Sequence, residues 1–318
     1  MTATALFADS GGFKPLPTIE ALRVISEGHQ LESVTDSRAA LLILRQRADI
    51  ALLVSNSPDY ELFTQFRALH PKGQAILVTD LAMISYSGLL HGEEATLVDH
   101  IIVNKGRENW TVNQLRITLA KIRTKDIFGI AKYLAPHTPI HKEQIRSSSQ
   151  RETLNLQVQR FAEACHLGQH IARVAFGISE ELLMNTIYDA PVAAGIPRFQ
   201  NVDQLTSIIL QPEEYGELSY GCDGQILAIS SSDPFGALKK TTLLTYLKKV
   251  LRREDGEGLI DDKKGGAGLG LFKILYSSHG IVCNVEKGNR TEIMALIDIN
   301  DPLRDFASLA RSIHYFSA

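Results

Sequence analysis

A glycine-rich loop, Gly266-Ala267-Gly268-Leu269-Gly270, runs directly into an apolar stretch with helical character. The backbone N–H groups of such a loop, together with the positive end of the helix that follows, favour the binding of phosphate. Ordinary turns also contain glycine clusters. The loop therefore indicates phosphate binding only in combination with polar residues elsewhere in the chain.

A carboxylate and an amide stand four residues apart earlier in the chain, at Glu181 and Asn185, in a stretch with the apolar spacing of a helix. Residues four apart lie on the same helix face. Carboxylate and amide oxygens are ligands that Mg²⁺ prefers, and a carboxylate also serves as a general base. Taken alone, the pair is better explained as two solvated helix residues.

Two predicted hairpins flank the glycine loop in sequence. The first turns at Asp223-Gly224, a pair typical of tight turns, and its second strand ends at Asp233. The second hairpin follows the loop and carries Thr291. Four elements in this order are far more specific than any one of them.

The bulk composition is that of a globular protein. The chain has 318 residues, of which 44% are hydrophobic and 22% charged, with a formal net charge of −3. This charge argues against a general nucleic-acid surface, which is normally basic. Three cysteines, Cys165, Cys222 and Cys283, match no zinc or disulfide framework, so we expect a cytoplasmic location. The sequence shows neither a signal peptide nor a membrane-spanning stretch.

Residues 1–125 are predicted to form an α/β domain with a doubly wound, parallel, five-stranded sheet, because short apolar runs alternate with amphipathic stretches. Helices are expected at 18–27, 36–47, 60–69 and 112–122, the second with Asp36 or Ser37 as its N-cap. The expected strands are 5–8, 30–34, 50–54, 74–78 and 100–103.

This segment resembles the receiver domain of bacterial response regulators over roughly residues 3 to 123. Thr79 and Lys105 follow the fourth and fifth predicted strands, where receivers keep a switch hydroxyl and a phosphate-binding lysine. The position of the phosphoacceptor aspartate holds Val54, and Asp9 alone remains of the acidic cluster. The resemblance therefore implies a pseudo-receiver that docks a partner and is not phosphorylated.

Residues 126–154 are predicted to be a linker that runs into a connecting helix, because they combine prolines and serines with little apolar periodicity after Leu134. His166 and His170 have the spacing of a metal pair, but no third ligand stands nearby, and a structural or surface role is favoured. His170 also lies too close to Asn185 for the dimerisation hairpin of an orthodox histidine kinase.

Residues 155–318 are predicted to form a second domain, which from about 155 to 299 resembles the GHKL superfamily. The ATPase fold of that superfamily (the Bergerat fold) is an α/β sandwich shared by histidine kinases, gyrase, mismatch-repair proteins and anti-sigma-factor kinases. The resemblance implies that Asn185 coordinates Mg²⁺ and that Glu181 orients or activates the attacking group. It implies that Asp233 accepts a hydrogen bond from the adenine amino group. We also expect a helix at the C-terminus of this domain.

The glycine motifs of that superfamily are matched unevenly. Gly266, Gly268 and Gly270 correspond to the loop that contacts the triphosphate, and Thr291 to a phosphate-contacting threonine. Gly236 is the glycine that follows Asp233, but Phe235 and Ala237 stand where the motif has its small glycines. Lys263 or Lys264 is placed to reach the γ-phosphate, although surface positions explain both lysines equally well.

Two functions follow from these patterns. The first is a signalling protein that binds ATP and Mg²⁺ and gates its interaction with partner proteins. The alternative is an active anti-sigma-type kinase that phosphorylates serine or threonine on a partner. Neither reading involves nucleic acid or a membrane span, and self-association remains open.

Overall fold

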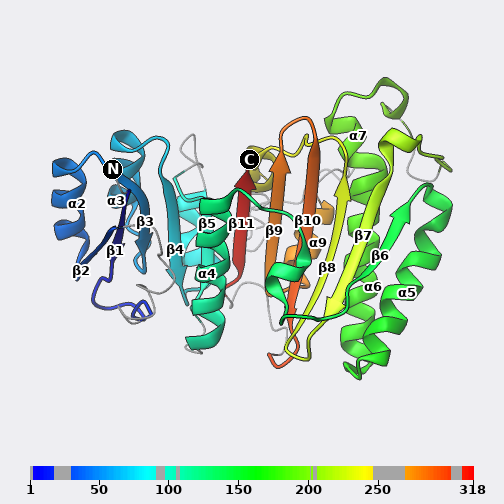
Figure 1. Cartoon of the computed structure of the whole chain (residues 1–318), viewed down its shortest axis with the longest axis horizontal. Helices are drawn as coiled ribbons and strands as arrows, with labels where there is room; N and C mark the ends of the chain where they lie inside the picture. The colour runs from blue at the N-terminus through cyan, green and yellow to red at the C-terminus, as the bar shows by residue number, and fades with distance from the viewer. Residues whose placement is uncertain are drawn as a thin grey trace. The chain divides into compact units, whose positions relative to one another are not determined.

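The computed structural model describes residues 3–17, 30–90, 97–104, 108–200, 202, 206–245, 269–301 and 310–318. The chain is a mixed α/β protein that divides into two compact units (Figure 1). The first unit is formed mainly by Met1–Asp126, and the second mainly by Ile127–Tyr246 with Gly256–Arg304. Within the described residues, no helix is both long and apolar enough to cross a membrane.

The first unit contains a parallel sheet with the strand order β2-β1-β3-β4-β5. The strands are β1 (Thr4–Ala8), β2 (Gln30–Val34), β3 (Ile50–Ser55), β4 (Gln74–Thr79) and β5 (His100–Val103). The helices are α2 (Ser37–Gln46), α3 (Tyr60–Leu69) and α4 (Glu108–Thr124), with the 3-10 turn η1 (Met83–Leu90) after β4. All five predicted strands are confirmed, and the helix predicted at 18–27 lies outside the described residues.

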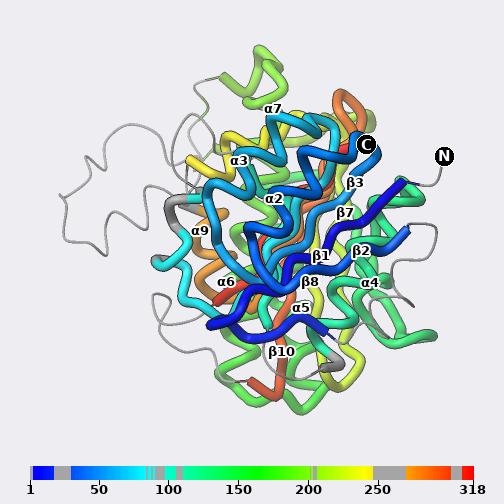
Figure 2. Tube along the Cα trace, turned by 90° about the vertical axis from the view of Figure 1, so that its left-hand side faces the viewer, coloured from blue at the N-terminus to red at the C-terminus, as the bar shows by residue number. Residues whose placement is uncertain are grey.

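Helices cover both faces of this sheet. Leu115 and Leu119 of α4 pack in one buried cluster with Phe7, Val54 and Ile76. Figure 2 shows α2 and α3 on the other side of β1 and β3 from α4. Each fully buried aliphatic side chain stabilises the fold by about 1.5–3 kcal/mol. The apolar strand runs are therefore explained by burial on both faces.

Side-chain caps set where α2 and α3 begin. The Asp36 carboxylate accepts the Ala39 N–H at 2.7 Å, which confirms one of the two predicted caps. Asp59 accepts the Leu62 N–H at 3.1 Å in the same way. Each cap satisfies a backbone donor that the first helical turn leaves without a partner.

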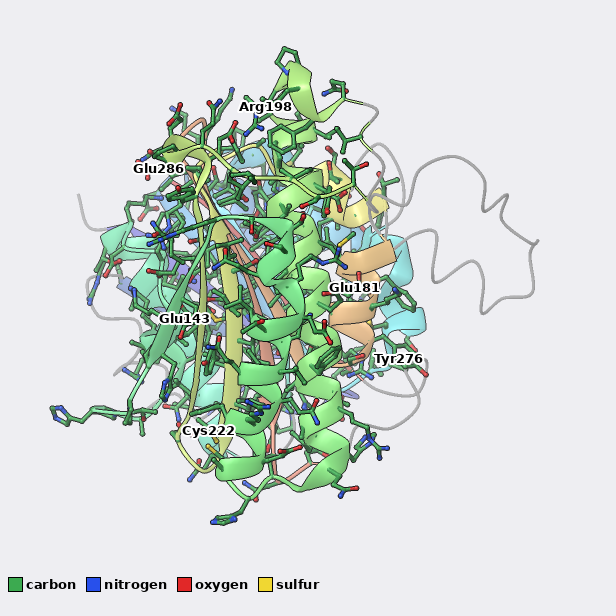
Figure 3. All side chains as sticks on the ribbon, turned by 90° about the vertical axis from the view of Figure 1, so that its right-hand side faces the viewer. Glu143, Glu181, Arg198, Cys222, Tyr276 and Glu286 are labelled. Atoms are coloured by element: carbon green, nitrogen blue, oxygen red, sulfur yellow. The ribbon has the colours of Figure 1, made fainter. Side chains whose placement is uncertain are left out.

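The second unit contains an antiparallel sheet with the strand order β9-β10-β8-β7-β6. The strands are β6 (His141–Ile145), β7 (Gly216–Cys222), β8 (Ile226–Asp233), β9 (Gly280–Glu286) and β10 (Arg290–Asp298). Helices α5 (Arg151–Ala164) and α6 (Gly168–Met184) pack on one face, as Figure 3 shows. Near the end of α6, the carbonyl of Leu182 accepts a hydrogen bond from Ser231 of β8 at 3.1 Å.

Short helical turns complete this unit. The π-helical turn η4 (Asn185–Asp189) continues α6 and leads into α7 (Ala190–Ala193), while α9 (Leu269–Tyr276) precedes β9. The 3-10 turns are η2 (Ile130–Tyr133), η3 (Ser148–Gln150), η5 (Pro197–Phe199) and η6 (Pro212–Glu214). The predicted tight turn at Asp223-Gly224 is confirmed, with Gly224 at φ +85.

Residues 126–154, predicted to be a linker that runs into a connecting helix, contain packed structure before α5 begins at Arg151. This segment supplies β6, and its earlier part, residues 127–134, packs across the sheet face opposite α5 and α6; we call this part the strap. Ile127, Ile130, Tyr133 and Leu134 are all buried. Their apolar side chains cover that face of the sheet, which explains why the segment is ordered.

The buried carboxylate of Glu292 holds the strap on β10. Glu292 accepts the Gly129 N–H at 2.9 Å and the side-chain amide of Asn284 at 2.8 Å, and Ser230 donates to its other oxygen at 3.2 Å. A carboxylate is stable inside a protein only when its oxygens are hydrogen-bonded in this way.

Among the described C-terminal residues, a strand is found where a helix is expected. The described residues 310–318 contain the strand β11 (Ser312–Ser317), whereas residues 302–309 lie outside the description. Ile313 and His314 belong to the first unit and pair with β5. Tyr315 belongs to the second unit, where its hydroxyl donates to the Leu238 carbonyl at 2.9 Å.

Candidate functional site

A cavity of about 260 Å³ opens in the second unit between the helical face and the sheet. Its polar lining residues are Asn185, Asp189, Asp233, Thr242 and Thr291. Its apolar lining residues are Ala190, Val192, Ala193, Leu238, Leu271 and Ile293. A mostly apolar cavity with a few convergent polar groups is the usual form of a small-molecule site.

The helix that carries Asn185 is built by apolar spacing. Ala172, Ala175, Ile178 and Leu182 recur every three or four residues and are buried. The helix then widens to a π-turn from Asn185 to Asp189, and both ends of that turn line the cavity. Single π-turns inside helices are frequent at functional sites.

Asp233 and Thr291 reach the cavity from neighbouring strands. They are direct partners in the antiparallel ladder between β8 and β10. The Phe235 N–H donates to the Asp233 carboxylate at 2.9 Å. Burial raises the pKa of Asp233 to about 6, although the N–H groups of Phe235 and Gly236 act in the opposite direction.

The Thr291 hydroxyl is buried beside this carboxylate. It lies near enough to lower the pKa of Asp233, yet it meets no protein atom in good hydrogen-bond geometry within the described part of the chain. A buried hydroxyl costs free energy unless it finds a partner. The Thr291 hydroxyl and the Asp233 carboxylate therefore give the cavity a donor and an acceptor that a bound polar group would satisfy.

Gly236 is fixed by a close backbone crossing. Its φ is +58, and a Cβ there would lie 2.0 Å from the Glu286 carbonyl oxygen. The Gly288 N–H donates to the Gly236 carbonyl at 3.2 Å. This glycine thus holds the chain after Asp233 against the β9–β10 hairpin, and it does not line the cavity.

Glu181 lies beside the start of α9, one turn before Asn185. Its side chain is labelled in Figure 3, and its Oε1 pairs with Lys273 Nζ at 2.5 Å. A Cβ on Gly270 would lie 2.9 Å from Glu181 Oε2, so a larger residue there would press on the carboxylate. Glu181 and Gly270 do not line the cavity themselves, but Leu271 does.

Asp189 is a cavity residue that the sequence analysis missed. Burial, and then the charge of Glu181, raises the pKa of Asp189 to about 6. Perturbed carboxylates concentrate at functional sites. The available signal was helical spacing, because Asp189 follows Asn185 by four residues.

The glycine loop is described only in part. Gly266 and Gly268 lie outside the described residues, as do Lys263 and Lys264. Of the expected site residues, Asn185, Asp233 and Thr291 are brought together around one cavity.

The polar end of the first sheet is internally hydrogen-bonded. The Asp9 carboxylate accepts the Asn56 side-chain N–H at 2.6 Å and the Leu16 N–H at 3.2 Å. Thr79 accepts the Leu81 N–H at 3.1 Å, and Lys105 lies outside the described residues. Val54 is fully buried in the core.

No metal cluster is found in the part of the chain that the structure describes, counting groups of three or more His, Cys, Asp or Glu. His166 and His170 therefore gain no third ligand of these types there. His166 instead stands just after α5 in the left-handed region, with φ 58.

Comparison with known proteins places the chain in no family. No protein-family model matches the sequence, and no curated protein matches it. One solved structure with some similarity is described as the SiaB-SiaC complex from Pseudomonas aeruginosa, at 16% identity and a TM-score of 0.32. The match covers 59% of this chain and 98% of the other. A likeness of this size assigns no function.

Proposed function

We propose that the second unit is a GHKL-type domain that binds ATP with Mg²⁺ in the cavity between α6, η4, β8 and β10. The observation that supports this most directly is the convergence of Asn185, Asp233 and Thr291 on one cavity. These residues come from three separate elements. The sequence motifs alone predict all three as site residues.

Six of the lining residues then have a chemical task. The Asp233 carboxylate accepts the adenine amino group, which an ionised acid does well in a partly apolar site. The Asn185 amide oxygen is a ligand for Mg²⁺. The Thr291 hydroxyl donates to a phosphate oxygen. The apolar residues Leu238, Leu271 and Ile293 provide contact area for the base and ribose.

We further propose that the chain is an intracellular signalling protein. In this proposal the first unit is a receiver-like docking domain that accepts no phosphoryl group, because Val54 occupies the acceptor position. Nucleotide binding in the second unit gates contact with partner proteins.

A kinase of the anti-sigma type is the second candidate, and Glu181 is the observation that favours it. The charge of Glu181 acts on a residue that lines the cavity, because it raises the pKa of Asp189. Phosphoryl transfer depends on positioning and Mg²⁺ more than on covalent chemistry, so one general base near the γ-phosphate suffices.

Calorimetry on the full chain tests the proposed function. We expect ATP to bind in the presence of Mg²⁺, to bind more weakly after chelation of the metal, and to be preferred over GTP. Absence of binding heat for ATP with Mg²⁺, supported by absence of protection against thermal unfolding, would overturn the proposal.

A further inference from the structure

Two cysteines of the second unit lie in matching positions, Cys165 at the C-cap of α5 and Cys222 at the end of β7. On α5, Phe161 and Cys165 are four residues apart and so share one helix face. On β7, Tyr220 and Cys222 are two residues apart and so share one sheet face. The rings of Phe161 and Tyr220 contact each other, with their centroids 5.0 Å apart.

The distance along α5 from Phe161 to Cys165 is about equal to the distance along β7 from Tyr220 to Cys222. One helical turn advances about 6 Å over four residues, and two strand residues advance about 6.6 Å. The side chains of Cys165 and Cys222 therefore lie one step beyond the aromatic contact, near enough for Cys222 to act on the Cys165 thiol. Figure 3 labels Cys222 at the end of the sheet.

The electrostatics agree with this placement. The pKa of the Cys165 thiol is raised, first by burial and then by the neighbouring Cys222. Both cysteines are half-buried, so reagents in solvent reach them, whereas Cys283 is fully buried. Neither cysteine of the pair lines the cavity.

We propose that Cys165 and Cys222 form a redox-active dithiol that closes to a disulfide when it meets a small-molecule disulfide. The pair is a modification site separate from the nucleotide cavity, and it stands whether or not that cavity binds ATP.

The chemistry is thiol–disulfide exchange in two steps. The Cys222 thiolate attacks one sulfur of the small disulfide, which forms a mixed disulfide and releases one small thiolate. The Cys165 thiolate then attacks the Cys222 sulfur, forms the protein disulfide and releases the second small thiolate. The two protein thiols lose two protons and two electrons, and the small disulfide is reduced to two thiols.

The bridge would join the end of α5 to the end of β7. The closed loop would contain α6 and η4, and therefore Asn185 and Asp189 of the cavity. A disulfide that closes a long loop restricts the unfolded chain strongly. Oxidation would thus fix the helical layer onto the sheet.

Oxidised glutathione is the probe for the test, applied to the fully reduced, full-length protein. The expected product has lost about 2 Da, the mass of two hydrogens, and yields a peptide pair joined through Cys165 and Cys222 after digestion without reductant. The Cys283→Ala variant is the matched control and should give the same product, because the buried thiol takes no part.

Single variants test the order of events. In Cys165→Ser, the mixed disulfide with glutathione should persist on Cys222, since no second thiol is present to resolve it. Cys222→Ser should give no intramolecular bridge. Stable glutathione adducts on both cysteines of the wild type, or a bridge that includes Cys283 or a second chain, would overturn the proposal.

Discussion

Asp233 and Thr291 stand directly opposite each other in the ladder between β8 and β10, and both line the same cavity. They are far apart in the sequence, and the region between them includes the glycine loop. The register of one strand pair therefore brings a carboxylate with a raised pKa beside a buried hydroxyl. The Asp233 carboxylate is the basis for the first three predictions.

Replacing Asp233 with Asn should weaken ATP binding about 10- to 100-fold, which corresponds to about 1–3 kcal/mol for a lost charged hydrogen bond. The variant should also lose the preference for ATP over GTP. Titration calorimetry with both nucleotides measures the two effects. Glu217→Gln, which makes the same chemical change on the opposite face of the sheet, serves as the control and should bind as the wild type does.

Adenosine binding should strengthen with pH. The pKa of Asp233 is about 6, so the carboxylate that accepts the amino group is mostly protonated at pH 5 and mostly ionised at pH 7. We expect affinity to rise roughly tenfold over that range. Adenosine is the ligand of choice because it carries no titrating phosphate. A pH-independent affinity would remove the assigned role of Asp233, and Asp233→Asn should show such a flat profile.

The carboxylates of Asp233 and Asp189 should make folding stability fall as pH rises. Asp233 and Asp189 have pKa values raised to about 6 in the folded chain, from an ordinary value of 3.8. Between these values the folded state binds more protons than the unfolded state, so the free energy of unfolding decreases with pH. For Asp233 the change is roughly 1–3 kcal/mol, and less for the more exposed Asp189. Urea unfolding at pH 4.5 and 7.5 should show a smaller decrease in Asp233→Asn.

Glu181 and Asn185 distinguish the two candidate functions. In a kinase, Glu181→Ala should abolish phosphoryl transfer or hydrolysis and leave ATP binding nearly intact, because a general base contacts the attacking group. Asn185→Ala should weaken Mg²⁺-dependent binding in either case. Turnover of labelled ATP, measured with binding in parallel, separates these effects. Signalling in cells that survives Glu181→Ala but not Asn185→Ala would favour the nucleotide-gated adaptor.

Small phosphodonors should leave the first unit unchanged. Val54 has no oxygen that forms an acyl phosphate, and the Asp9 carboxylate is already hydrogen-bonded to Asn56 and Leu16. Trp110 of α4 is the single tryptophan of the chain and reports on this unit by fluorescence. Acetyl phosphate or beryllofluoride with Mg²⁺ should cause no change. A phosphoaspartate mapped within residues 1–125 would show that the assignment of position 54 is wrong.

Local sequence patterns predict the strands and turns well, because the spacing of apolar and turn-forming residues within a short segment is enough to specify each one. The apolar run from Ile50 to Val54 reads as a buried strand, and the structure places it in the centre of the parallel sheet. The Asp223-Gly224 turn follows from backbone geometry alone. Predictions of this kind need no knowledge of distant contacts.

Tertiary relationships were less accessible to the sequence. The opposition of Asp233 and Thr291 depends on strand register, which a single sequence does not display. Asp189 carries no motif of its own, and its raised pKa comes from burial and from Glu181. The strap falls within the predicted linker because little apolar periodicity follows Leu134. Only the sheet beneath Ile130 and Leu134 explains why these residues are buried.

The strap also determines how this protein can be divided for study. A fragment that begins after Leu134 would lack the Gly129 N–H that Glu292 accepts, and it would expose the sheet surface that Ile130 and Leu134 cover. In such a fragment the buried Glu292 carboxylate would have one hydrogen-bond donor fewer. Glu292 lies on β10, next to the strand β8 that holds Asp233. Any expression boundary for the second unit therefore belongs before Ile127.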